Sequence, residues 1–266
     1  MEIIGYIASL IIGVSLGLIG GGGSILTVPV LVYLFHIDPV LATAYSLFIV
    51  GATSLVGVFP KYRDGMVNMK TAIIFGIPSI ISVYATRKWV VPAIPEEIFT
   101  IGSFTFTKPL VIMLLFALLM AAASISMIRD KKTVMDKDVV LEQQFNYPLI
   151  MLEGMLVGAL TGLVGAGGGF LIIPALVILS KLPMKQAVGT SLLIIAMKSL
   201  FGFLGDMSHT VMDWKLLLSV TALAIIGLFI GNSFNRKINP NSLKKGFGWF
   251  VLVMGIYIII KELFFK

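Results

Sequence analysis

Two glycine runs and one lysine are the residues of this chain that could bind a small ligand. The runs are Gly20, Gly21, Gly22 and Gly23, followed by Ser24, and Gly165, Gly167, Gly168 and Gly169. Each glycine disfavours a helix by roughly 1 kcal/mol relative to alanine, so both runs predict a break in an apolar helix. A short helix that starts after such a break offers free N–H groups to an oxyanion. We therefore predict an anion site at the breaks, with close helix packing as the alternative explanation of the glycines.

A polar stripe follows each glycine run on the next predicted helix. Ser191 and Lys198 are seven residues apart, which places both within about 20° of one helix face. A polar face on an apolar helix should point into the protein or a cavity, although a single hydroxyl can instead bond to its own helix backbone. The candidate binding side chains of the two stripes and their neighbours are Tyr45, Ser46, Thr53, Thr190, Ser191 and Lys198.

Lys198 lies about halfway along its predicted helix. A lysine at the centre of a membrane helix costs about 2.5–3.5 kcal/mol on insertion scales. We hypothesise that a bound anion is its partner and that anion binding depends on the proton that the lysine carries. The alternative is a lysine without function whose head reaches water along its flexible stem.

Both glycine runs belong to a repeated unit. Residues 13–46 align without a gap with residues 158–191, at an offset of 145 residues. The chain is therefore a tandem duplication, with predicted membrane repeats at 1–128 and 147–266 and a hydrophilic link at 129–146. Apolar segments that glycine and proline interrupt at matching positions of two halves are typical of a transporter's binding site.

The composition is that of an integral membrane protein. Of the 266 residues, 58% are hydrophobic and 12% are charged, whereas soluble domains have about 25% charged residues. The chain has no cysteine and two histidines, so we expect no metal and no cofactor. We attribute the net charge of +7 to membrane topology rather than to nucleic acid binding. The N-terminus is expected to be a retained first helix, because it lacks a basic leader region.

The apolar segments predict an all-α membrane protein with about eight full spans and two short helices. Of the basic residues, 13 lie in segments predicted to be cytoplasmic and six in segments predicted to be outside. The aligned loops 61–70 and 206–215 fall on opposite sides in this scheme, so the repeats are predicted to be inverted, with both termini outside. The longest outside loop is predicted at 87–107, against the lipid headgroups, with a gating role as the alternative. Parallel repeats are the alternative, and the glycine breaks could form either re-entrant hairpins or full crossings.

With these features in view, the chain resembles the sulfite exporter TauE/SafE family. The shared motifs are G-L-x-G-x-G-G-G-F-L-x-x-P-A-L from Gly162, L-P-M-K-x-A-V-G-T-S-L from Leu182 and S-L-x-G-F-L-G from Ser199. The resemblance implies a secondary transporter of small anions in the inner cell membrane. Sulfite and organosulfonates are the best-known substrates of that family, and the transport mechanism is alternating access.

Other functions remain open beside this expectation. An anion channel and a transporter of small carboxylates would use the same site chemistry. A membrane enzyme is disfavoured, because the chain lacks thiols and a cluster of histidine with acidic residues. The expected partners are a small anion, a coupled proton or sodium ion and the lipid bilayer, without nucleic acid. The oligomeric state is left open.

Overall fold

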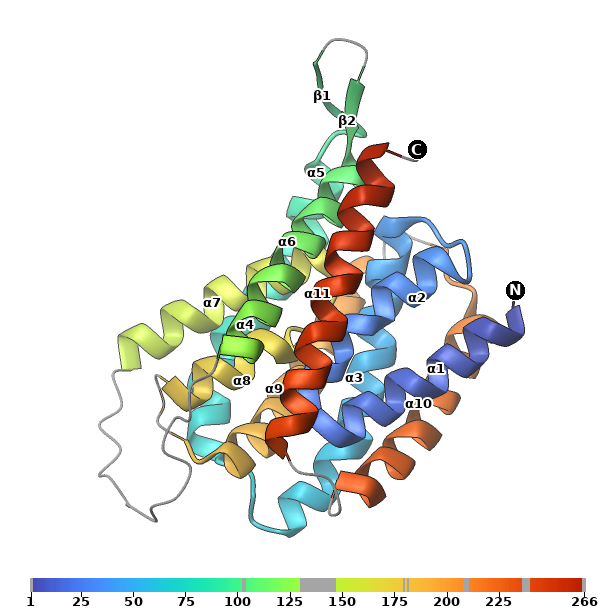
Figure 1. Ribbon diagram of the computed structural model, residues 1–266. Helices are drawn as coiled ribbons and strands as arrows, with labels where there is room; N and C mark the ends of the chain where they lie inside the picture. Colours follow the sequence, from blue (N-terminus) through green and yellow to red (C-terminus); the bar gives the residue numbers. More distant parts are fainter. Residues whose placement is uncertain are drawn as a thin grey trace.

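The protein is a bundle of helices in the computed structural model, which describes residues 2–101, 104–129, 147–178, 180, 182–207, 211–235 and 240–264 (Figure 1). The first half contains α1 (Glu2–Ile19), the 3-10 helix η1 (Gly20–Leu26), α2 (Thr27–Tyr33), α3 (Pro39–Arg63), α4 (Met69–Ala85), the π-helix η2 (Thr86–Val90), α5 (Val91–Ala93), β1 (Glu97–Ile101), β2 (Phe104–Thr107) and α6 (Lys108–Arg129). The second half contains α7 (Tyr147–Val164), α8 (Gly169–Ile178), α9 (Met184–Asp206), α10 (Trp214–Asn235) and α11 (Pro240–Phe264). Apart from Arg129, the predicted link lies outside the described residues, with Lys131, Lys132 and Lys137.

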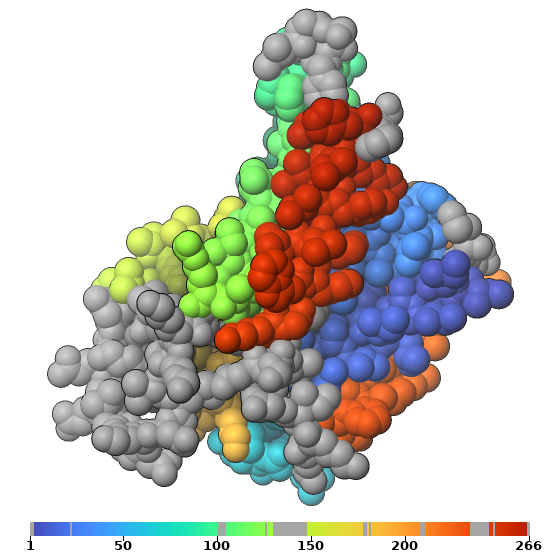
Figure 2. Space-filling model, viewed as in Figure 1, coloured from blue at the N-terminus to red at the C-terminus, as the bar shows by residue number. Residues whose placement is uncertain are grey.

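Several described helices are long and apolar enough to cross a membrane. Five segments meet this condition in the part of the chain that the structure describes: Pro39–Arg63, Met69–Ala93, Lys108–Arg129, Met184–Asp206 and Trp214–Phe234. Figure 2 shows α6 and α11 along one face of the molecule. Trp249, Val253 and Tyr257 of α11 are exposed. Apolar side chains on the outside suit contact with lipid, and the chain is a multi-pass membrane protein. The exact number of spans stays a prediction.

A short β-hairpin departs from the all-α expectation. The strands β1 and β2 pair antiparallel, with Thr100 opposite Thr105, and the rings of Phe99 and Phe106 stack with centroids 4.4 Å apart. In Figure 1 the hairpin projects from one end of the bundle. The expected loop 87–107 is therefore partly wrong, because the helix continues to Ala93 and the strands follow. Threonine, isoleucine and phenylalanine favour strands, but runs this short give a weak signal.

Each half turns back on itself at its glycine run. In Figure 1 the start of α1 and the end of α2 both lie at the right, whereas the start of α7 and the end of α8 both lie at the left. Each pair of helices around a glycine run thus ends on the same side of the bundle as it begins. The two turning points lie in the middle of the bundle, where η1 contacts α8.

The two halves pack against each other in reciprocal pairs. Helix α1 packs on α10, and the repeat-equivalent helices α7 and α4 pack in the same way. Equivalent glycines permit these contacts: a Cβ on Gly13 would overlap the carbonyl of Ala224, and a Cβ on Gly158 would lie 2.5 Å from the carbonyl oxygen of Ser79. Small residues of this kind allow close backbone approach. Both members of each contact are 145 residues from their counterparts.

The helices that carry the polar stripes occupy the centre. Helices α3 and α9 pack on each other, and 67% of each apolar span is buried inside the protein. The buried clusters around them are apolar, with Val50, Ile194 and Ile195 as members. The serine, threonine and lysine side chains of the stripes are therefore held inside the protein, as their polar character predicts.

Candidate anion-binding site

The two glycine breaks meet at the centre of the bundle. A Cβ on Gly169 would overlap the backbone of Gly21, and a Cβ on Gly21 would lie 2.9 Å from the Cα of Gly169. A side chain at either position would push the two segments apart, so glycine is required for this approach. The contact places η1 directly against the N-terminal end of α8.

The two breaks differ in backbone conformation. In the second, Gly165, Gly167 and Gly168 have positive φ angles of 69°, 63° and 72°, and α8 begins at the next residue. In the first, the chain turns at Gly20, which has a positive φ of 71°, and the run then continues as the 3-10 helix η1. Both runs therefore interrupt the α-helix, the second with an irregular turn and the first with a turn at Gly20 followed by a 3-10 helix. A 3-10 helix keeps its hydrogen bonds in a tighter winding, which a glycine run tolerates.

Lys198 lies beside the second glycine run. The side chain is 1% exposed, and its Nζ donates a hydrogen bond to Thr161 Oγ1 at 2.7 Å. A Cβ on Gly168 would lie 2.6 Å from the same Nζ, so the absence of a side chain there makes room for the ammonium group. Thr161 donates its own proton to the Val157 carbonyl, so its oxygen is turned to accept from Lys198. The ammonium is thereby fixed against the break.

The charge on Lys198 has no acidic partner among the residues that the structure describes. The described ion pairs are elsewhere, between Arg87 and Asp206 and between Lys108 and Glu96. An ammonium group has three N–H donors, and Thr161 accepts one of them. A buried charge without a counter-charge is costly, and an oxyanion bound beside the ammonium would offset that cost.

The N-terminus of α8 adds to the positive potential at this place. Leu171 and Ile172 donate their backbone N–H groups to the Gly168 carbonyl, which closes the first turn of the helix. The preceding N–H groups of a helix have no partner within the helix, and the helix dipole places partial positive charge there. The ammonium of Lys198 and this helix end together form an environment that suits a small anion.

Seven of the fifteen predicted site residues come together at the crossing: Gly21, Ser24, Gly167, Gly168, Gly169, Ser191 and Lys198. The Oγ of Ser24 lies 3.4 Å from a Cβ placed on Gly167, and the Oγ of Ser191 lies 3.6 Å from one placed on Gly21. Both hydroxyls donate to their own helix backbone, to Gly21 and to Val188. Their protons are therefore used locally, and the two serines can offer an anion no donor in this arrangement.

Two predicted site residues act as ties between helices and loops. The hydroxyl of Tyr45 accepts a hydrogen bond from the backbone N–H of Asp213. The hydroxyl of Thr190 accepts one from the backbone N–H of Asn68 at 2.9 Å. Both contacts hold the ends of α3 and α9 to neighbouring loops, so neither side chain faces the crossing of the breaks.

The remaining predicted residues are five in the first half and Gly165 in the second. Ser46 and Thr53 are buried, and their hydroxyls have no hydrogen-bond partner among the described residues. Gly20 packs against Val188. The other glycines pack as follows: Gly165 against Thr43 and Gly23 against Ser15 and Leu16, while Gly22 continues the winding of η1.

Thr161 is the site residue that the sequence analysis missed. Position 161 corresponds to Leu16 in the first half, so the comparison of repeats gives no signal there. The available signal was that Thr161 is the one aliphatic hydroxyl on the apolar helix α7. Its direct contact with Lys198 joins α7 and α9 at the break.

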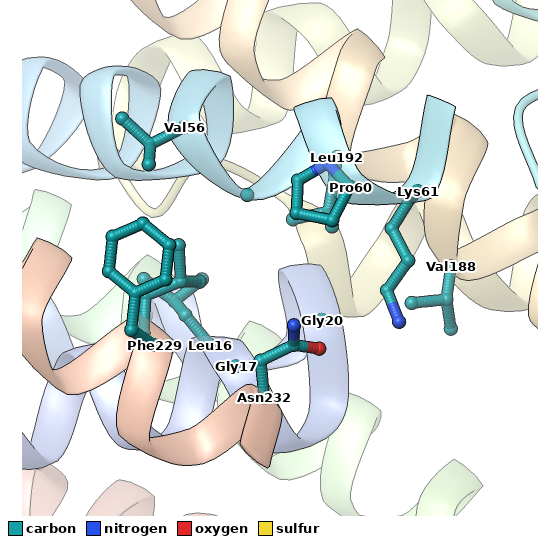
Figure 3. A pocket seen from close by; sticks show the side chains of 12 residues that line it. Leu16, Gly17, Gly20, Val56, Pro60, Lys61, Val188, Leu192, Phe229 and Asn232 are labelled. Carbon is teal, nitrogen blue, oxygen red and sulfur yellow. The ribbon is translucent and has the colours of Figure 1, made fainter. Parts of the chain in front are cut away.

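A small cavity lies on the first-half side of the crossing, next to Gly20 (Figure 3). Its volume is about 20 Å³, which is enough for a water molecule. Residues from α1, η1, α3, α9 and α10 line it, among them Gly20, Gly57, Lys61, Val188, Leu192 and Asn232. Lys198 is not part of the lining, so the cavity and the ammonium are separate parts of the centre.

The family model for the sulfite exporter TauE/SafE matches residues 6–258. The chain belongs to the TauE/SafE family. This TauE/SafE protein is 29% identical over 255 residues to a probable membrane transporter protein of Xylella fastidiosa strain 9a5c, covering 94% of this chain and 91% of that protein.

Two further relatives come from other groups of organisms. The probable membrane transporter protein YdhB of Bacillus subtilis is 27% identical over 237 residues, 88% of this chain and 91% of its own length. The probable membrane transporter protein MJ0441 of Methanocaldococcus jannaschii is 25% identical over 268 residues, 96% and 94% of the two chains. No solved structure matches this chain significantly.

Proposed function

We propose that this TauE/SafE protein is a secondary transporter of small anions, with sulfur oxyanions or organosulfonates such as sulfite as substrates. Its family membership makes it a membrane transporter. The observation that carries the anionic class is the buried ammonium of Lys198, which lies against the second glycine break without an acidic partner among the described residues. Such a charge is expected to select anions.

The binding chemistry follows from the groups around Lys198. Thr161 accepts from the ammonium and holds it in place, so the remaining ammonium donors are available to an oxyanion. The start of α8 provides backbone N–H groups next to Gly168, where no side chain blocks the approach. An oxyanion between these two groups would accept charge-assisted hydrogen bonds, which are stronger than neutral ones.

The reciprocal packing of the halves supports inverted repeats and alternating access. Packing of α1 on α10 and of α7 on α4 is what a two-fold relation between the repeats produces. With the positive-charge bias, this relation would bring the two breaks to the middle from opposite sides of the inner cell membrane. Both termini would then lie outside, and a proton or sodium ion would be the coupling ion.

A transporter suits the centre better than an open channel does. Lys198 is enclosed by Gly168 and Thr161, and it does not line the cavity beside Gly20. An anion therefore needs a change of conformation to reach the ammonium and to leave it. Alternating access provides that change, whereas a channel would require a continuous pore.

A flux screen in proteoliposomes tests this function. Purified protein should take up sulfite or a small sulfonate with saturation, and a proton or sodium gradient should drive uptake against the anion gradient. Faster uptake of acetate than of either sulfur anion would move the substrate class to carboxylates. Flux that rises linearly with anion concentration and ignores ion gradients would instead identify a channel.

A further inference from the structure

A buried ion pair joins the two halves at the end of α9. Arg87 in η2 is 0% exposed, and its Nη1 lies 3.4 Å from Oδ2 of Asp206. The guanidinium nitrogens Nε, Nη1 and Nη2 have no hydrogen-bond partner among the described residues, so this charge contact is long and incomplete. Arg87 is predicted to begin the outside loop 87–107, but the helical path continues through it.

The repeat relates this ion pair to the cavity beside Gly20. Moving Lys61 forward by the 145-residue offset gives Asp206, and moving Asn232 back by the same offset gives Arg87. Lys61 and Asn232 both line the cavity, and Figure 3 shows the Lys61 side chain extending from α3 toward the level of Gly20 and Asn232. One pair of positions is thus occupied by an ion pair in one half and borders a cavity in the other.

The cavity is local, because the equivalent glycines Gly57 and Gly202 are both closely packed: a Cβ on Gly57 would lie 3.2 Å from Leu228, the counterpart of Val83. A Cβ on Gly202 would lie 3.0 Å from Val83 and 3.3 Å from Leu47, and a Cβ on Gly205 would lie 3.0 Å from the Cβ of Arg87. The counterparts of Gly202 and Leu47 in the other half are Gly57 and Leu192, and both line the cavity. A lysine and a neutral asparagine cannot form an ion pair, so these two positions provide no ion pair on that side among the described residues.

Helix α9 connects the cavity, the central ammonium and the ion pair. Val188 at the cavity is ten residues before Lys198, and Asp206 is eight residues after it, which corresponds to about 15 Å and 12 Å along a helix. At 100° per residue the three positions fall within about 80° of one face. Lys198 therefore lies between the hollow side and the closed side on a single helix face.

We propose that Arg87 and Asp206 form the outer gate of the anion pathway and that the cavity beside Lys61 and Asn232 is its inner mouth. The structure is then an occluded arrangement, in which the ammonium of Lys198 is enclosed and the small hollow lies on the inner side. Arg87 is also the first anion-binding group on the outside. An arriving oxyanion takes the place of the Asp206 carboxylate on the guanidinium, and the side chains packed around the ion pair then move apart. This inference rests on the proposed function for the nature of the passing ion.

Single cysteines test the gate directly, because the natural chain contains none. Leu47→Cys and Leu192→Cys are repeat-equivalent probes. Leu47 packs near Gly202 beside the ion pair, and Leu192 lines the cavity. In the otherwise unchanged protein, a membrane-impermeant thiol reagent should label position 192 from the inside faster than it labels position 47 from the outside. Adding Asp206→Asn should raise labelling at position 47 by roughly tenfold and lower labelling at position 192.

Matched variants separate gating from general loosening of the fold. Glu96→Gln removes the other described ion pair, in which Glu96 is 80% exposed, and should change neither labelling rate. The exchange Arg87→Asp with Asp206→Arg keeps the ion pair and should restore slow labelling at position 47. If Asp206→Asn does not insert, Arg87→Gln combined with Asp206→Asn removes both charges and should give the same reciprocal shift.

The proposed gate would be wrong if a variant that inserts but lacks the ion pair shows unchanged labelling at positions 47 and 192. The labelling needs no substrate, so this result is independent of the flux screen. A reciprocal shift without any anion uptake would keep the gate and remove the proposed substrate class. Anion uptake without a reciprocal shift in labelling would keep the proposed substrate class and remove the gate.

Discussion

Lys198 and Arg87 are both buried cations, but the protein treats them differently. Arg87 has the carboxylate of Asp206 beside it, whereas Lys198 has the neutral oxygen of Thr161. Buried charges are normally paired, so the unpaired ammonium points to a partner that comes from solution. A lysine inside an apolar helix stands out in a sequence, and Lys198 was predicted for that reason. Thr161 was not, because one threonine in an apolar helix is common and its contact with Lys198 depends on how two helices pack.

The cost of burying Lys198 leads to a stability prediction. Lys198→Met keeps the length and apolar body of the side chain and removes the ammonium, whose burial costs about 2.5–3.5 kcal/mol in a membrane helix. In buffer without a binding anion, the variant should therefore unfold at a higher temperature than the natural protein, by several degrees in a thermal melt. Lys215→Met is the control, because that lysine is exposed and its loss should leave the melting temperature unchanged. A lower melting temperature for Lys198→Met would mean that the ammonium stabilises the fold without an anion.

At the scale of the elements, the sequence predicts where the helices end better than it predicts how they are joined. The predicted break at Gly165–Gly169 matches the end of α7 at Val164 and the start of α8 at Gly169, because the apolar pattern stops and restarts at the glycines. The conformation of the glycines was not predictable in the same way. Glycine permits both the irregular turn of the second half and the 3-10 winding of η1, so the choice falls to the surrounding packing.

The second break predicts that a side chain added at Gly168 impairs anion transport. Gly168→Ala should insert but lose most anion transport, because its Cβ would overlap Thr161 and lie 2.6 Å from the ammonium of Lys198. Part of the effect is backbone strain at a φ of 72°, and Gly65→Ala measures that part alone, since its φ is 68° and nothing lies within 4 Å of the added atom. Gly65→Ala should keep transport within a factor of about two. Equal transport by Gly168→Ala and Gly65→Ala would show that the space beside Lys198 is not used by the anion.

At the scale of the whole molecule, the duplication explains why distant segments meet. The 145-residue offset is visible in the sequence, and it relates α1 to α7 and α4 to α10. The sequence does not reveal that a helix of each repeat packs on a helix of the other, because α1 and α10 are far apart in the chain. For the same reason the contact between Arg87 and Asp206 was not foreseen, although both charges were visible.

Inverted repeats predict that aligned loops lie on opposite sides of the membrane. Asp64→Cys and Val211→Cys place single thiols in the aligned loops 61–70 and 206–215, where both residues are exposed. An impermeant thiol reagent added to intact cells should label position 211 and leave position 64 unlabelled until the membrane is opened. Glu97→Cys in the hairpin should react like position 211. Labelling of positions 64 and 211 from the same side would establish parallel repeats.

The most direct test of the central claim is the affinity of purified protein in detergent for a small sulfonate such as methanesulfonate. A sulfonate keeps its charge as the pH changes, so any pH dependence of binding belongs to the protein. The natural protein should bind the sulfonate, and binding should weaken as rising pH removes the proton from Lys198. Lys198→Met should bind roughly 10- to 100-fold more weakly, the value of a charge-assisted hydrogen bond of about 1.5–3 kcal/mol, and should lose the pH dependence. Lys198→Arg should fall between the two, because it keeps the charge but moves it. Equal affinities and identical pH profiles for the natural protein and Lys198→Met would contradict the assignment of Lys198 as the counter-charge of the transported anion.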